Sequence, residues 1–162
     1  METTISVKHI TKVIKAPYQR YKEKMLSLLG RIGEEDLKLM AEQPGTAKDR
    51  LAELGGFEDL MLFGVQEHGQ LLRLAGQQRS AIQIILGNPL VALQMTQYDI
   101  RAALYAPLRL LIYEVSPNVL NVEYDLPSTL FGQFGSSEVL ETGLLLDAKL
   151  EKLFEASLAD PM

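Results

Sequence analysis

Side chains that can hold a small molecule are concentrated between residues 98 and 125. Phenol hydroxyls, carboxylates and a guanidinium orient small polar or anionic ligands through hydrogen bonds and charge. They fall at the expected ends of helices and strands, where ligand groups are common. The set is Tyr98, Asp99, Arg101, Tyr105, Tyr113, Tyr124 and Asp125. We predict a ligand-binding site made by His68, Tyr98, Asp99, Arg101, Tyr105, Tyr124 and Asp125.

Arg101 also has a structural interpretation. Its guanidinium can pair with the carboxylate of Asp99 or of Asp125. Such a pair would fasten the helix that precedes Arg101 to the strands that follow it. Both interpretations stay open at the level of the sequence.

The chain has two histidines, His9 and His68. His9 lies within an expected strand and is interpreted as a half-exposed strand residue. His68 follows the end of another strand, where it is either a ligand group or a structural cap. A metal site usually needs three or four ligands, and no spacing around His68 supplies them. We therefore predict no metal site and leave the cofactor unknown, with haem held by His68 and Met95 as an open alternative.

A catalytic constellation is a second hypothesis. His68, Asp99 and Asp125 would serve a small metal-assisted or acid/base enzyme if their side chains converge. The absence of cysteine excludes disulfides, thiolate zinc sites, iron–sulfur ligation and a cysteine nucleophile. Gly132–Gly135 lacks the lysine and the repeated glycines of a phosphate-binding loop.

The elements that must position these residues follow from hydrophobic periodicity. Alternation and β-branched residues predict strands at residues 5–14, 60–67, 79–86, 108–115 and 119–125. Helical spacing and end signals predict helices at residues 17–29, 33–43, 47–54, 89–99 and 136–159. Helical turns are expected at 70–75 and 127–135. Asn88 is a good N-cap, and Pro89 suits the first helical position.

The order of these elements predicts the fold class. No helix is expected between the second and third strands, or between the fourth and fifth. We therefore predict an α+β fold, with a mainly antiparallel sheet of about five strands and helices packed on one face. Residues 1–159 are expected to form a single domain with a helical insertion at 33–56, and 160–162 a tail. An alternative role for the insertion is a docking face for a partner protein.

The block from Gly87 to Gly135 carries a series of short motifs. They are Gly87-Asn88-Pro89, Met95-Thr96, Tyr98-Asp99, Leu104–Pro107, Tyr113-Glu114, Glu123-Tyr124-Asp125 and Phe131–Gly135. These motifs resemble the bacterial and archaeal family named domain of unknown function 302, over about residues 60–154. The resemblance implies an α+β fold and a homodimer, and it implies no established reaction. The insertion at 33–56 departs from the short members of that family.

Charge and hydropathy limit the partners. The 16 Lys and Arg residues are outnumbered by 21 Asp and Glu, for a net charge of −5, so we expect no nucleic-acid partner. No apolar run reaches the ~18 residues of a membrane helix, and the first residues do not resemble a secretory signal. We expect a cytoplasmic, prokaryotic homodimer that binds a small polar or anionic ligand or another protein. The alternative is the enzyme that uses His68, Asp99 and Asp125.

Overall fold

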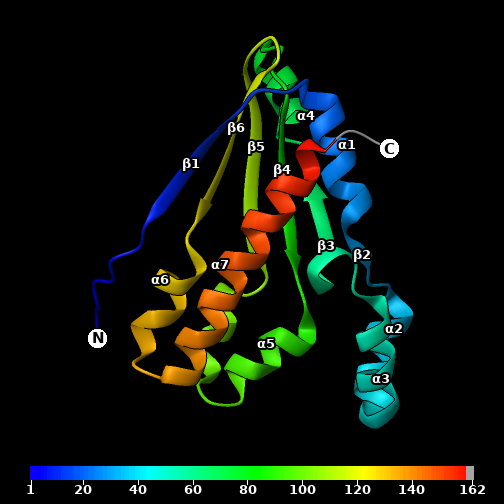
Figure 1. The fold of residues 1–162 in the computed structure, drawn as a ribbon, viewed down its shortest axis with the longest axis vertical. Helices are drawn as coiled ribbons and strands as arrows, with labels where there is room; N and C mark the ends of the chain where they lie inside the picture. The colour runs from blue at the N-terminus through cyan, green and yellow to red at the C-terminus, as the bar shows by residue number, and fades with distance from the viewer. Residues whose placement is uncertain (160–162) are drawn as a thin grey trace.

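Six strands form one open sheet in the order β1-β6-β5-β4-β3-β2 in the computed structural model, which describes residues 1–159 (Figure 1). Neighbouring strands are antiparallel except β2 and β3, which are parallel. The strands are β1 His9–Ile14, β2 Gly30–Arg31, β3 Met61–Gln66, β4 Ala81–Gly87, β5 Leu108–Ser116 and β6 Val119–Asp125. The prediction of a mainly antiparallel α+β sheet is confirmed. The additional strand, β2, has two residues and is too short to leave a sequence pattern.

Seven α-helices accompany the sheet within the described residues. They are α1 Tyr18–Leu28, α2 Glu34–Glu42, α3 Pro44–Leu54, α4 His68–Leu72, α5 Pro89–Thr96, α6 Pro127–Phe131 and α7 Ser137–Leu158. Short 3-10 segments are η1 Phe57–Asp59, η2 Arg73–Ala75, η3 Ile100–Tyr105 and η4 Gly132–Phe134. In the part of the chain that the structure describes, none of the helices is both long enough and apolar enough to cross a membrane.

Three predicted boundaries are wrong. The helix expected at 47–54 begins at Pro44, because the proline occupies the first turn of the helix. The helix expected at 89–99 ends at Thr96, because the Asp99 carboxylate accepts a hydrogen bond from the Arg101 backbone N–H at 3.0 Å and begins η3 instead. The first strand begins at His9 rather than at residue 5, since its pairing with β6 starts at His9 and Asp125. The predicted tail at 160–162 lies outside the described residues.

The helices cover one face of the sheet. Along β5, Leu108, Leu110 and Ile112 are buried, while the intervening Arg109 is exposed. Figure 1 shows α7 lying along the sheet with α1 beside it. The side chains under these helices form the core, and the opposite face, which we call the open face, carries the alternate residues.

Strand direction determines which chain segments meet at each end of the sheet. β4 ends at Gly87, β5 begins at Leu108, β6 ends at Asp125 and β1 begins at His9, all at the end that α5 occupies. We call this the α5 end. His68 follows β3, which runs antiparallel to β4, so it lies at the opposite end. The α2–α3 hairpin projects beside the α5 end (Figure 1).

The junction between β4 and α5 is held by Asn88, as its sequence position predicts. Its side-chain oxygen accepts a hydrogen bond from the Leu90 N–H at 2.8 Å. Its Nδ2 donates to the carbonyl oxygen of Asp59 at 2.7 Å. Glu58 and Asp59 both have positive φ, and the buried Lys149 donates to the Glu58 carbonyl oxygen at 2.6 Å. Asn88 therefore caps α5 and also holds a strained turn that α7 contacts.

Substitution of Asn88 tests this double role. Asn88→Ala removes both hydrogen bonds and should lower the free energy of unfolding by about 2–3 kcal/mol. Asn88→Ser keeps a capping oxygen, so it should cost only about 1 kcal/mol. Urea denaturation followed by circular dichroism measures both, with Gln97→Ala on the exposed end of α5 as the control. Equal losses for the two Asn88 variants would contradict the contribution of the cap to Leu90, and an Asn88→Ser variant as stable as the wild type would contradict that of the bond to Asp59.

Candidate functional site

An apolar cavity of about 220 Å³ lies beneath α5, at the α5 end of the sheet. Val91, Ala92 and Met95 contribute from α5, while Phe131 and Leu146 contribute from α6 and α7. The Gly87-Asn88-Pro89 and Ala106-Pro107 segments also border it. Several motifs of the Gly87–Gly135 block, which are apart in the sequence, therefore line the same cavity.

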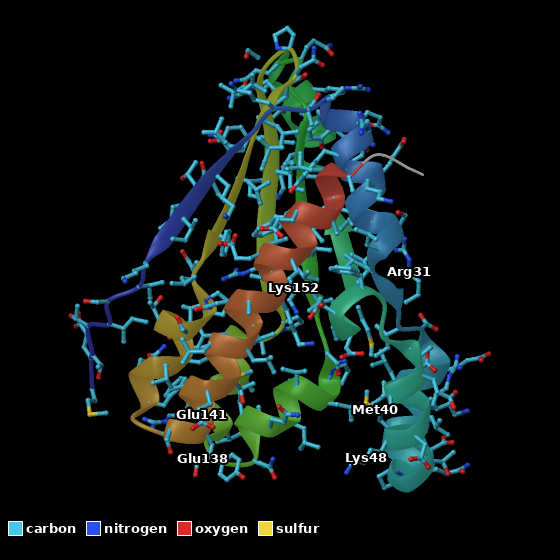
Figure 2. All side chains as sticks on the ribbon, in the orientation of Figure 1. Arg31, Met40, Lys48, Glu138, Glu141 and Lys152 are labelled. Atoms are coloured by element: carbon cyan, nitrogen blue, oxygen red, sulfur yellow. The ribbon has the colours of Figure 1, made fainter. Side chains whose placement is uncertain are left out.

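The cavity approaches the open face at Gly87. A Cβ atom on Gly87 would lie 3.6 Å from Pro107 Cβ and 3.8 Å from Phe63 Cε2. The side chains of Phe63 and Pro107 are exposed to solvent, so these three residues mark where the cavity comes near the surface. Met40 of α2 also borders the cavity, and it projects from the α2–α3 hairpin on the side of α5 (Figure 2).

A second cavity, of about 100 Å³, is lined by β5 and β6 together with Leu130 of α6 and Leu150 of α7. The two strands pair from Leu111 and Glu123 onward, and the cavity occupies the gap nearer the α5 end. It shares Pro107 and Leu108 with the apolar cavity. Its polar lining residues are Tyr105, Arg109, Tyr124 and Asp125. Three of the predicted ligand residues, Tyr105, Tyr124 and Asp125, are thus brought together.

The polar groups of the second cavity differ in how far they are already engaged. The buried Tyr124 donates its hydroxyl to Glu151 Oε1 at 3.1 Å, and burial together with Glu151 raises the pKa of that phenol. Glu151 is also paired with Lys12, at 2.6 Å between Oε2 and Nζ. Tyr105 packs its ring against Phe134, with 6.1 Å between centroids. Its hydroxyl makes no hydrogen bond within residues 1–159.

Asp125 belongs to a network on the open face that we did not predict. His9 Nδ1 lies 3.0 Å from Asp125 Oδ1, and His9 Nε2 lies 3.1 Å from Glu123 Oε2. The Tyr113 hydroxyl donates to Glu123 Oε1 at 2.5 Å and accepts from Asn121 Nδ2 at 2.9 Å. Both imidazole nitrogens must donate, because both face carboxylates.

The His9 interactions have a matching electrostatic effect. Hydrogen bonds to Asp125 and then to Glu123 raise the pKa of His9 above its ordinary value. The protonated ring therefore joins β1 to β6. His9 is half exposed, as the sequence indicates. Its partners were not foreseen, because they depend on the register between two strands more than a hundred residues apart.

Tyr98, Asp99 and Arg101 lie in the turn after α5, outside the lining of either cavity. Arg101 Nη2 is 2.6 Å from Asp99 Oδ2, and this hydrogen bond lowers the pKa of Asp99. The guanidinium also lies 5.1 Å from the centroid of the Phe134 ring. The ion pair considered for Arg101 is present, but it closes a single turn rather than joining the helix to the hairpin. Tyr98 is exposed.

His68 does not join the other predicted residues. It begins α4 at one end of the sheet, while Asp99 and Asp125 lie at the α5 end. Met95 is buried beside the apolar cavity, so it does not face the same space as His68. Within residues 1–159, three or more His, Asp or Glu side chains are nowhere grouped so that they could hold a metal ion.

Comparison with known proteins gives a family and a fold. The family described as "Domain of unknown function DUF302" matches residues 38–157. A crystal structure of the "uncharacterized conserved protein DUF302 from Bacillus stearothermophilus" is similar over 91% of this chain and 96% of that chain. The TM-score is 0.62 and the sequence identity 15%, so this similarity concerns the fold. No curated protein matches the chain.

The His9 network predicts a pH dependence of stability. The pKa of His9 is higher in the folded state than the ordinary 6.5 of an unfolded chain. Its stabilising effect is therefore complete below about pH 6.5 and is lost as the pH rises through the folded-state pKa. The difference in unfolding free energy between the wild type and His9→Gln should shrink from about pH 6 to about pH 9.

Urea denaturation at several pH values measures that difference. Because the pair is partly exposed, about 0.5 M salt should reduce it at the lower pH. A difference that does not change with pH would show that the charged ring is not what joins the strands.

Proposed function

The chain belongs to the DUF302 family, whose description matches residues 38–157, and on that premise we propose that it binds a small, mainly apolar organic molecule beneath α5. The observation that carries this proposal is the cavity of about 220 Å³. Its walls include Gly87, Met95, Pro107 and Phe131, which come from four separate motifs of the block. The family description itself assigns no activity.

The size and lining of the cavity favour a ligand over ordinary core packing. The cavity opens to solvent beside Phe63, Ala103 and Pro107, and a concave, mainly apolar opening of this kind is typical of small-molecule sites. An apolar cavity of about 150 Å³ is enough to bind benzene in another protein. A volume of about 220 Å³ is below the roughly 300–1,000 Å³ of sites for drug-sized molecules. The proposed ligand is therefore about the size of one substituted ring or a short hydrocarbon chain.

The proposal uses part of the predicted ligand-binding set. Tyr105, Tyr124 and Asp125 border the second cavity, which adjoins the apolar one. Asp99 and Arg101 already pair with each other. The enzyme alternative receives no support, because His68 lies at the other end of the sheet from Asp99 and Asp125.

A neutral probe with a filled-cavity variant tests the proposal. The wild type should bind 3-phenylpropanol, with NMR shift changes at Val91, Met95 and Phe131. Ala92→Leu places three carbon atoms in the cavity and should weaken binding by about tenfold or more. The control is Ala52→Leu, at an exposed position of α3 that borders neither cavity. Absence of binding to the wild type at millimolar probe, or equal affinity for Ala92→Leu, would contradict the proposal.

We also propose that the protein is a homodimer. The support is a stripe of exposed apolar residues on α7, where Leu140, Leu144 and Leu145 are 39%, 52% and 45% exposed. Leu140 and Leu144 are one helical turn apart and lie away from the buried side of the helix. A second copy would remove this stripe from water.

Light scattering tests the oligomeric state. The wild type should give twice the 18.1 kDa mass of one chain at micromolar concentration. Leu144→Lys should give 18.1 kDa particles, because it would place a charge in the contact. Leu104→Lys, at a highly exposed site of η3, is the matched control. A wild-type mass of a single chain would show that the dimer does not form.

A further inference from the structure

We propose that the ligand of this site is an amphiphile of the arylalkyl carboxylate class, with its carboxylate held by Arg109 and Tyr105. Its apolar body would fill the cavity beneath α5. This inference rests on the proposed function and names the chemical class of its ligand.

The two cavities are neighbours at the α5 end of the sheet. They share Pro107 and Leu108 as lining residues. Arg109 lies opposite Ile85 in the pairing of β5 with β4, and its side chain belongs to the open face. Gly87, at the approach to the apolar cavity, is two residues further along β4 on that same face. Two residues of a strand span about 7 Å, which a short alkyl chain covers.

Arg109 is the cation available at this place. Its guanidinium makes no hydrogen bond or ion pair within residues 1–159, and it borders the second cavity. The other unengaged polar group there is the Tyr105 hydroxyl. A guanidinium has only donors, and its planar fork matches a carboxylate. Together with the hydroxyl of Tyr105, which borders the same cavity, it would select a hydrogen-bond acceptor with negative charge.

Within residues 1–159, none of the carboxylates forms an ion pair with Arg109. Asp125 borders the same cavity, and its Oδ1 lies 3.0 Å from His9 Nδ1. The same imidazole lies 3.1 Å from Glu123 Oε2, so it is shared by two carboxylates. Glu151, which approaches from α7, is paired with Lys12 at 2.6 Å. Asp125 and Glu151 thus have other partners, and the Arg109 guanidinium is available for a ligand.

Three probes that share a phenyl ring and a three-carbon chain, and differ only in their polar end group, test this inference. They are 3-phenylpropionate, 3-phenylpropanol and 3-phenylpropylamine, with dissociation constants from NMR titration or calorimetry. The wild type should bind the acid about tenfold more tightly than the alcohol, and the amine most weakly. Arg109→Gln should remove this preference while leaving the alcohol affinity within about twofold. Arg109→Lys should keep part of the preference.

Further variants separate a local effect from a general one. Arg73→Gln removes an exposed arginine of η2 and should leave all three affinities unchanged. Tyr105→Phe should reduce the preference for the acid by about threefold, which also provides a test if Arg109→Gln does not fold. Thermal unfolding of each variant shows whether it is folded.

The outcomes distinguish this inference from the proposed function. Equal binding of acid and alcohol by the wild type, unchanged in Arg109→Gln, would overturn the carboxylate assignment and leave the apolar site in place. Failure of all three probes to bind the wild type would overturn both.

Discussion

Packing of α1 and α7 against the sheet buries every second side chain of β4, β5 and β6, and the rest of the structure depends on this one-sided burial. Fully buried residues such as Ile84, Leu110 and Val122 occupy one face. The alternate positions are left free to carry polar groups, because they contribute little to the core. The hydrogen-bonded network of His9, Glu123 and Tyr113 is built from such positions.

Both cavities lie where this regular packing is interrupted. The apolar cavity lies at the α5 end of the sheet, where β4 ends and α5 begins. The second cavity lies where β5 and β6 are no longer paired. Interruptions of this kind leave side chains without close neighbours, so they are natural places for a ligand. Asn88 holds the junction between β4 and α5 through its hydrogen bonds to Leu90 and Asp59.

Local signals made most of the fold predictable from the sequence. The hairpin expected at 108–115 and 119–125 agrees with β5 and β6 to within one residue, since alternation and turn residues are local. The start of α5 was predicted from Asn88 and Pro89 for the same reason. The end of α5 was not, because the Asp99 carboxylate competes for the backbone N–H of Arg101.

The candidate site was only partly predictable. Tyr105, Tyr124 and Asp125 border one cavity, and their role in binding a ligand stays a prediction. The interactions of His9 depend on the register between β1 and β6, and the position of Arg109 depends on the gap between β5 and β6. Hydrophobic periodicity predicts neither feature, so both residues were missed. Strand direction, rather than residue type, separates His68 from the rest.

The two-residue strand β2 has a consequence for how copies of this sheet can associate. After Arg31 the chain leaves the sheet for α2, so β2 pairs only with Met61 and Leu62, and the rest of β3 forms that edge of the sheet. At the other edge, β1 carries His9 and Lys12, and their side-chain charge disfavours the addition of another strand. Addition of another strand is therefore disfavoured along β1, while at the opposite edge it is limited to the short part of β3 beyond Leu62.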